Sequence, residues 1–241
     1  MDYSCVPERG WDVLPSFVGD GFLSAEIFHE VQQHPLLPGE SAWGTRNLLH
    51  ALILSTRPRV VVEIGAHIGA GSLAIGSALR ANGFGKSYHL EPQEQYYRVL
   101  RDFINRAGLD DYAYPLQMSS SNPVLPSLVD HEAELIFLDA NHDYSEAYHD
   151  LMICDLLLSR EGFVLVEDVA REHSEQMCAE ARGGVRRALI DYVAARPDFS
   201  LMFLEPPLWL NPCGLAIMAR KPADQLRSPS PNRQASLEVV D

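Results

Sequence analysis

The sequence predicts an α/β fold in which seven strands form one doubly wound sheet, mostly parallel with an antiparallel last strand, and helices cover both faces. Three observations lead to this prediction. Strand-like and helix-like segments alternate along the chain, which is typical of parallel sheets with helical crossovers. Four of the first five expected strands end in an acidic residue. The last two strands lie so close in sequence that an antiparallel pair is easier to form than a crossover.

The individual elements follow from apolar runs and turn residues. Uninterrupted or alternating apolar runs predict strands, and apolar residues at helical spacing predict the helices between them. The expected strands are residues 60–62, 87–91, 112–118, 134–139, 162–167, 199–204 and 215–219, and the expected helices are about residues 24–33, 43–54, 73–79, 93–106, 144–158 and 185–195. In the helix over 93–106, Tyr96 and Tyr97 share the spacing of Leu100 and Ile104, so we expect them in the core.

Composition and charge restrict the classes of function. With 241 residues, of which 46% are hydrophobic, the chain is large enough for one α/β domain with a sizeable core. The net charge is −14, from 33 acidic and 19 basic residues. Such a surface repels nucleic acid and anionic lipid, so neither is an expected partner. The four cysteines are scattered without a C-x-x-C pair and are expected to be reduced thiols: Cys5, Cys154, Cys178 and Cys213.

The chain divides into three expected regions. Residues 1–40 form an N-terminal segment that either caps a ligand crevice or is a loosely packed extension. Residues 41–221 form the α/β domain, and residues 222–241 form a polar, Ser/Pro-rich tail expected to be disordered. No signal-peptide core and no run of 18 apolar residues is present, so the expected location is cytoplasmic.

A Gly-rich turn after the first strand is the clearest indication of a ligand site. The strand over 60–62 is followed by Glu63 and then by Gly65, Gly69 and Gly71 at the start of a helix. A strand, a Gly-rich turn and a helix form a ligand crevice at the carboxyl edge of α/β sheets, because glycine permits close backbone approach. The spacing departs from the dinucleotide motif G-x-G-x-x-G, and Glu63 disfavours a phosphate. A ligand with a cationic or hydroxyl-bearing group suits this turn better than a phosphate does.

Acidic residues at the ends of neighbouring strands indicate where that ligand lies. Parallel strands share their carboxyl edge, so these acids are expected to converge on one crevice: Glu63, Glu91, Asp139, Glu167 and Asp168. Glu91 ends the second strand, where nucleoside-binding α/β domains use an acid to accept hydrogen bonds from ribose hydroxyls. The polar residues 119–122 after the third strand either line an adenine pocket or form a solvated loop.

These motifs resemble class I S-adenosylmethionine-dependent methyltransferases over about residues 40–221. Within that superfamily the chain is most similar to metal-dependent O-methyltransferases, such as catechol O-methyltransferase and the macrolide-sugar methyltransferases of antibiotic pathways. The resemblance rests on residues 62–69 (VEIGAHIG), 90–92 (LEP), 137–142 (FLDANH) and 166–169 (VEDV). It implies a Rossmann-like sheet, S-adenosylmethionine as cofactor and Mg²⁺ or another divalent cation.

For the cofactor, the resemblance implies that Glu63 and the Gly-rich turn face the methionine part, that Glu91 binds the ribose and that Ser120 and Ser121 lie near the adenine. The complete implied set is Glu63, Gly65, Ala66, His67, Gly69, Glu91, Ser120, Ser121 and Asp139. His67 replaces the usual middle glycine of the turn, as a bulky residue does in the catechol-type enzymes. Ser120 stands where many relatives have an acid that touches adenine.

For catalysis, the resemblance implies that Asp139, Glu167 and Asp168 bind the cation and that His142 is the general base. Glu167 stands where that branch usually has Asp. Three neighbouring carboxylates repel one another unless a cation neutralises them, and oxygen ligands suit Mg²⁺ or Ca²⁺ better than zinc. A metal-bound hydroxyl is acidified, and a histidine titrates near neutrality, so it can take the proton. The alternative for His142 is a loop histidine hydrogen-bonded to its neighbours.

Four functions remain open on the sequence. The leading one is methyl transfer from S-adenosylmethionine to a hydroxyl of a small molecule, such as a natural product, a sugar or a catechol. The second is a metal-independent methyltransferase that acts on an amine or a carboxylate. The third, a nicotinamide-dependent oxidoreductase, is disfavoured by the glycine spacing, and the fourth is a non-catalytic cofactor- or partner-binding module. Acceptor specificity is expected to lie in residues 1–45, 171–184 and 205–213, and a homodimer is a reasonable default.

Overall fold

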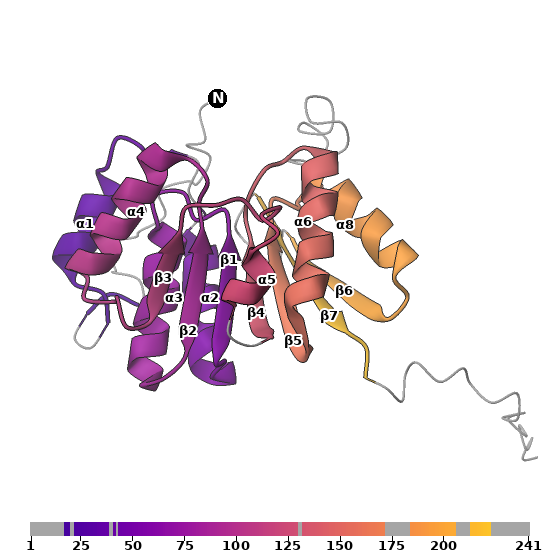
Figure 1. Cartoon of the computed structure of the whole chain (residues 1–241), viewed down its shortest axis with the longest axis horizontal. Coiled ribbons are helices and arrows are strands. Elements are labelled where there is room, and N and C mark those ends of the chain that lie inside the picture. The colour runs from indigo at the N-terminus through magenta and orange to yellow at the C-terminus, as the bar shows by residue number, and fades with distance from the viewer. Residues whose placement is uncertain are drawn as a thin grey trace, which may run out of the picture.

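A computed structural model confirms the predicted architecture (Figure 1). It describes residues 17–19, 22–38, 41, 43–129, 132–171, 184–205 and 213–222. Seven strands form one sheet in the order β3-β2-β1-β4-β5-β7-β6. The strands β1 to β5 are parallel, whereas β7 pairs antiparallel with both β5 and β6, so the closing hairpin is confirmed.

The observed bounds agree closely with the expected ones. The strands are β1 (Val60–Ile64), β2 (Lys86–Leu90), β3 (Ala113–Leu116), β4 (Ala133–Leu138), β5 (Leu158–Glu167), β6 (Phe199–Leu204) and β7 (Leu215–Arg220). The helices are α1 (Ala25–Gln32), α2 (Trp43–Thr56), α3 (Ala70–Asn82), α4 (Glu94–Arg106), α5 (Leu125–Leu128), α6 (Tyr144–Leu157) and α8 (Gly184–Ala195). The sequence did not predict α5, because a four-residue helix containing Pro126 is too short to show a helical period.

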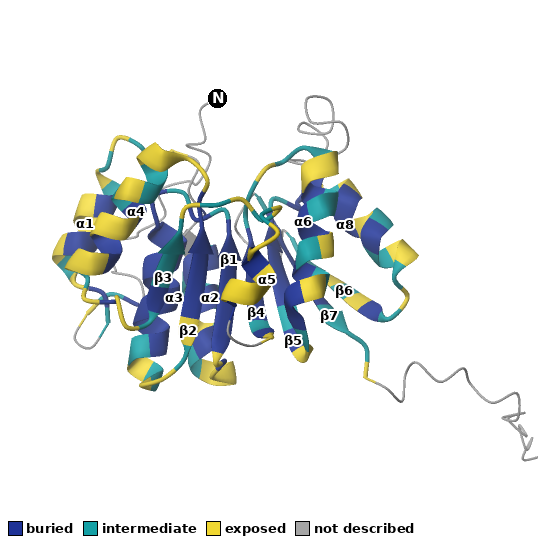
Figure 2. Ribbon diagram, in the orientation of Figure 1, coloured by how far each residue is buried: buried dark blue, intermediate teal, exposed yellow. Residues whose placement is uncertain are grey.

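Alternating side chains of the central strands pack against helices on the two faces of the sheet. Val60, Val62 and Ile64 pack with residues of α6 and α8, whereas Val61 packs with residues of α2 and α3. This two-residue period is the basic geometry of a strand. Figure 2 shows the central strands as almost continuously buried, with exposed residues on the outer sides of the helices. The carboxyl ends of β1, β2, β4 and β5 therefore meet at one edge of a well-packed sheet.

The described part of the N-terminal region packs beside α3 and α4. Ser24 caps α1 by accepting a hydrogen bond from the backbone N–H of Ile27 (3.3 Å), as Ser commonly does at this position. Phe17 and Phe28 are buried in a cluster that includes Phe103 of α4. Whether residues 1–40 cap a crevice stays a prediction, and the tail from residue 223 lies outside the described residues. Among the described helices, none has the length and apolar character needed to cross a membrane.

Candidate active site

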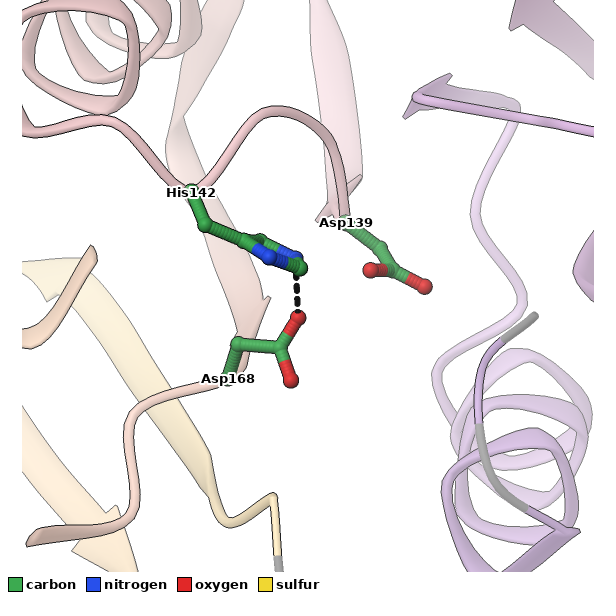
Figure 3. Close-up of side chains that lie close together, drawn as sticks. All are labelled: Asp139, His142 and Asp168. Carbon is green, nitrogen blue, oxygen red and sulfur yellow. Dashed lines mark ion pairs between the residues drawn. The ribbon is translucent and has the colours of Figure 1, made fainter. Parts of the chain in front are cut away.

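Asp139, His142 and Asp168 come together at the carboxyl edge of the sheet (Figure 3). Asp139 follows β4, Asp168 follows β5 and His142 lies in the loop before α6. Each offers a ligand atom within 4.8 Å of those of the other two, and Nε2 of His142 is 2.6 Å from Oδ2 of Asp168. All three side chains are partly exposed. Two carboxylates and an imidazole in this arrangement are suited to binding a divalent cation.

The backbone around this cluster places the three side chains. The N–H of Asp139 donates to the carbonyl of Ile64 (3.0 Å), which carries the β1–β4 pairing one residue past β4. A Cβ at Gly65 would lie 2.7 Å from the carbonyl carbon of Asp139, so only glycine permits this approach. Asp168 has a φ of 62°, a left-handed conformation that Asp adopts more readily than most residues. Such uncommon backbone conformations concentrate at functional sites.

The proton affinity of His142 reflects two opposing influences. Burial lowers the pKa of the imidazole, but the hydrogen bond to Asp168 and the negative charges of Asp168 and Glu167 raise it, and the net result is a pKa above its ordinary value. His142 is thus a hydrogen-bonded histidine, as the alternative prediction had it, and its partner is itself an expected metal ligand. The imidazole therefore lies directly beside one of the two clustered carboxylates.

Glu167 differs from the expected arrangement. Its carboxylate is buried and accepts a hydrogen bond from the Thr45 hydroxyl of α2 (2.7 Å), and it is not one of the three clustered side chains. The two-residue period of β5 explains this difference. Leu165 packs toward α2 and α3, and Glu167, two residues later, points to the same face. The side chain of Asp168, one residue later, lies near Asp139 instead.

A thiol also borders the cluster. Cys213 lies just before β7, and its carbonyl accepts a hydrogen bond from the N–H of Ala170 (2.8 Å). Burial raises the pKa of the Cys213 thiol, and the nearby charges of Asp168 and Glu167 and a hydrogen bond to Asp168 raise it further. Cys213 therefore stays a neutral thiol here. Cys154 and Cys213 are free, whereas Cys5 and Cys178 lie outside the described residues.

The Gly-rich turn uses its own amides to hold its shape. Gly65 and Ala66 donate their N–H groups to the carbonyl of Leu90 (3.1 and 2.9 Å), and Gly69 donates to the carbonyl of Ala66 (2.8 Å). Gly69 is the N-cap of α3, with a φ of 97° and no room for a side chain beside Leu100. These three predicted cofactor residues line the turn, but their N–H groups bond within the chain.

Glu91 is held at the end of β2 by backbone donors. The carboxylate is buried, and it accepts hydrogen bonds from the N–H groups of His67 (3.0 Å) and Gln93 (2.7 Å). His67 has a φ of 48°, and its ring centroid lies 4.0 Å from that of Tyr96. The prediction that Tyr96 and Tyr97 are core residues is wrong, because both are only half-buried, and Tyr96 packs on the turn instead. An acid, a histidine and a tyrosine thus gather beside the expected ribose position.

Glu63 lies beneath the turn. Its side chain is buried on the same face as Val61, where it accepts hydrogen bonds from Ser72 and from Nδ1 of His89 (2.6 Å). A Cβ at Gly71 would collide with Oε1 of Glu63, which explains the third glycine. In the structure, Glu63 supports the first turn of α3 from the side of the sheet.

The two serines near the expected adenine position are engaged by local partners. Ser120 donates a hydrogen bond to Asp150 of α6, and Ser121 shares a hydrogen bond with Ser119 (2.7 Å). Asp150 is buried, and its burial raises the pKa of the carboxyl group although the Ser120 hydrogen bond opposes the shift. Asp150 is not among the residues predicted from the sequence, yet its place three residues after Ala147 indicates the inward side of α6.

Comparisons with known proteins agree with this architecture. Residues 62–169 match a family described as a methyltransferase domain. The O-methyltransferase hkm8 of Aspergillus hancockii is 28% identical over 131 residues, which cover 54% of this chain and 49% of that protein. The chain thus spans about half the length of the curated relatives it matches.

Solved structures share the fold. The S-adenosylhomocysteine-bound methyltransferase PaMTH1 of Podospora anserina gives a TM-score of 0.67 at 20% identity, covering 82% of this chain and 87% of that one. An O-methyltransferase from Bacillus cereus with the same ligand gives 0.65 at 18% identity, covering 81% and 89%. Residues 62–169 are therefore similar to a methyltransferase domain, and the sheet has the same fold as these solved methyltransferases.

Proposed function

We propose that this protein transfers a methyl group from S-adenosylmethionine to a hydroxyl of a small molecule, with the help of a divalent cation. The observation that carries the proposal is the cluster of Asp139, His142 and Asp168 at the edge of a methyltransferase sheet. The names of the relatives support the choice of oxygen as the methyl acceptor, because several are O-methyltransferases. Two adjacent acceptor oxygens, as in a catechol or a sugar diol, would suit a cation best.

The residues of the cluster fit a divalent cation. Asp139 and Asp168 supply carboxylate oxygens, the ligand type that Mg²⁺ prefers, and the imidazole of His142 is close enough to be a nitrogen ligand or a base. In this proposal the two aspartates bind the cation, and His142 accepts the proton of the acceptor hydroxyl. When bound, the cation would acidify an acceptor hydroxyl and orient it. Glu167 supports the site indirectly, through its hydrogen bond to Thr45.

The residues at the end of β2 fit an adenosyl cofactor. Glu91 presents a buried carboxylate whose position is set by the N–H groups of His67 and Gln93, and such an acid can accept two ribose hydroxyls. S-adenosylmethionine would supply the reactive methyl group. The turn over Gly65–Gly69 gives a close approach for the methionine part, and Ser120 with Asp150 borders the adenine side.

His142 has the geometry of a general base. Asp168 orients its ring through Nε2 and stabilises the positive charge that the imidazole gains with a proton. The proton of the acceptor hydroxyl would pass to His142 as the acceptor oxygen attacks the methyl group. Binding both reactants at one sheet edge supplies proximity and orientation, which is a large part of the rate enhancement in such reactions.

Methyl transfer from methyl-labelled S-adenosylmethionine to a panel of catechols and sugar diols tests the proposal. We expect transfer with Mg²⁺ and none with excess chelator. Manganese titration separates the two roles: Asp168→Asn should weaken Mn²⁺ binding, whereas His142→Gln should keep it and lose transfer. Transfer that persists in chelator would contradict the metal-dependent mechanism. Transfer only to amines or carboxylates would support the alternative acceptor class.

A further inference from the structure

We propose that His89 is a positioning residue for the cofactor site, held as an imidazolium ion that pairs with Glu63 beneath the Gly-rich turn. The contacts of His89 are observed in the structure and do not depend on the proposed function. Its role in ligand binding rests on that function. His89 is not among the residues that the family resemblance assigns to the cofactor or to catalysis. The proposal follows from the hydrogen bonds around its ring and from the position of its partner.

The pair spans two neighbouring strands. Glu63 of β1 and His89 of β2 are direct partners in the parallel register, so their side chains lie on the same face of the sheet. Nδ1 of His89 lies 2.6 Å from Oε2 of Glu63, and Nε2 lies 2.8 Å from the hydroxyl of Ser87. His89, Glu63 and Ser87 are 0%, 1% and 0% exposed. Both ring nitrogens are therefore engaged in a place that excludes water.

The hydrogen count indicates that the ring carries two protons. The carbonyl of Tyr112 lies 3.0 Å from the Ser87 hydroxyl and can only accept, so we assign the hydroxyl hydrogen to that bond and the hydrogen between Ser87 and His89 to Nε2. On the other side, Oε2 of Glu63 already accepts the hydroxyl of Ser72, as an ionised carboxylate does. We therefore assign the hydrogen between Glu63 and His89 to Nδ1. An imidazolium beside a carboxylate is neutral as a unit, which reduces the penalty of burying either charge.

This neutral pair holds the ligand-binding turn in place. Oε1 of Glu63 occupies the space where a side chain at Gly71 would lie, against the first turn of α3. A carboxylate at a helix N-terminus is stabilised by the helix dipole. Without His89, Glu63 would be a buried carboxylate that lacks its counter-charge, and it would have to take up a proton or move. Either change would disturb the turn between Gly65 and Gly71.

Calorimetric titration of S-adenosylhomocysteine into the full chain and two variants tests this role. His89→Leu removes both ring contacts and should weaken binding by at least about tenfold. His89→Asn keeps a donor at the Nδ1 position but not the positive charge, so it should weaken binding by less than His89→Leu does. His29→Leu, on the exposed side of α1, is the matched control and should bind normally. Thermal melting of each variant shows whether it is folded.

Nitrogen-15 NMR of the imidazole rings tests the protonation state in the unsubstituted protein, so the proposal stays testable even where His89→Leu does not fold. We expect both nitrogens of His89 to give the shifts of protonated nitrogens. A neutral ring with one unprotonated nitrogen would overturn the imidazolium assignment. Normal ligand binding by folded His89→Leu would overturn the positioning role alone. If the unsubstituted chain binds no S-adenosylhomocysteine, the proposed function fails and the positioning role fails with it, while the NMR result still decides the charge of the ring.

Discussion

At the scale of single residues, the charge balance around His142 controls its proposed role as a base. Its imidazole is bonded to Asp168 and lies near Glu167, and these negative charges stabilise the protonated form. A base must be neutral to accept a proton, so these charges oppose that role while no cation is bound. A bound cation would repel the proton from the ring and favour the reactive form. Cation binding and activation of the base are therefore linked.

We predict that Asp168→Asn lowers the pKa of His142, because it removes the charge and the acceptor that raise it. A histidine with a raised pKa stabilises the fold below its unfolded pKa of about 6.5, and that contribution is lost as the pH rises through the folded value. The variant should therefore lose stability at pH 5.5 and little at pH 9. Because the side chain is 34% exposed, the difference should be below about 1 kcal/mol.

NMR titration of His142 and urea unfolding at the two pH values measure this effect. An unchanged His142 titration curve in Asp168→Asn would contradict the electrostatic account of the pair. Metal-free protein is required for both measurements, and addition of Mg²⁺ to the unsubstituted chain should itself lower the pKa of His142.

Two glycines with positive φ permit a matched comparison. We predict that Gly65→Ala destabilises the fold by about 3 kcal/mol, because its Cβ would collide with the carbonyl group of Asp139 at a φ of 91°. Gly83 has a φ of 77° but no atom within 4 Å of a built Cβ, so Gly83→Ala should cost about 1 kcal/mol. Urea unfolding gives both values. Equal losses would mean that the close approach of β1 and β4 is unimportant.

At the scale of elements, the strand period decides which acids face the proposed reaction. The sequence correctly predicted an acid at or next to the carboxyl end of β1, β2, β4 and β5. It did not predict that Glu63 and Glu167 would point toward α2 and α3, although Val61 and Leu165 two residues earlier indicate that face. The partners of these acids, His89 and Thr45, come from distant segments and carry no motif. Only the tertiary structure brings them together.

Helix α2 is joined to the end of β5 through Thr45 and Glu167. We predict that Thr45→Val destabilises the fold by about 1.5 to 3 kcal/mol, because Glu167 keeps its buried carboxylate but loses a donor 2.7 Å away. Ser55→Ala, which removes an exposed hydroxyl bonded to Ala51 on the same helix, should change stability by less than about 0.5 kcal/mol. Chemical denaturation measures both, and a loss in Thr45→Val no larger than in the control would contradict the proposed link.

The helix α4 shows the limit of periodicity. Helical spacing groups Tyr96 with Leu100 and Ile104, but near the edge of the sheet the same helix face leaves the core and meets the Gly-rich turn. Spacing alone therefore identified the inner side of α4 correctly at Leu100 and Ile104 and failed at its N-terminal end. Tyr96, in the first turn of α4 after Glu91, therefore lies nearer to the Gly-rich turn than its helical spacing indicates.

At the scale of the whole molecule, the doubly wound topology explains why so much of the site was predictable. Parallel strands bring their carboxyl ends to one edge, so the position of Asp139 and Asp168 follows once the strands are known. The expected specificity segments over 171–184 and 205–213 fall mostly outside the described residues. Irregular segments have no hydrophobic period from which the sequence could predict their conformation. The class of reaction could therefore be inferred from the sequence, whereas the acceptor could not.

Calorimetric titration of S-adenosylhomocysteine into the unsubstituted chain and into Glu91→Ala tests the central claim most directly. Glu91 is the buried acid whose two oxygens are held by His67 and Gln93 at the expected ribose position. We predict binding in the micromolar range for the unsubstituted chain and at least about tenfold weaker binding for the variant. Equal binding by the two proteins would contradict the assigned cofactor site, and no binding by either would contradict the methyltransferase function itself.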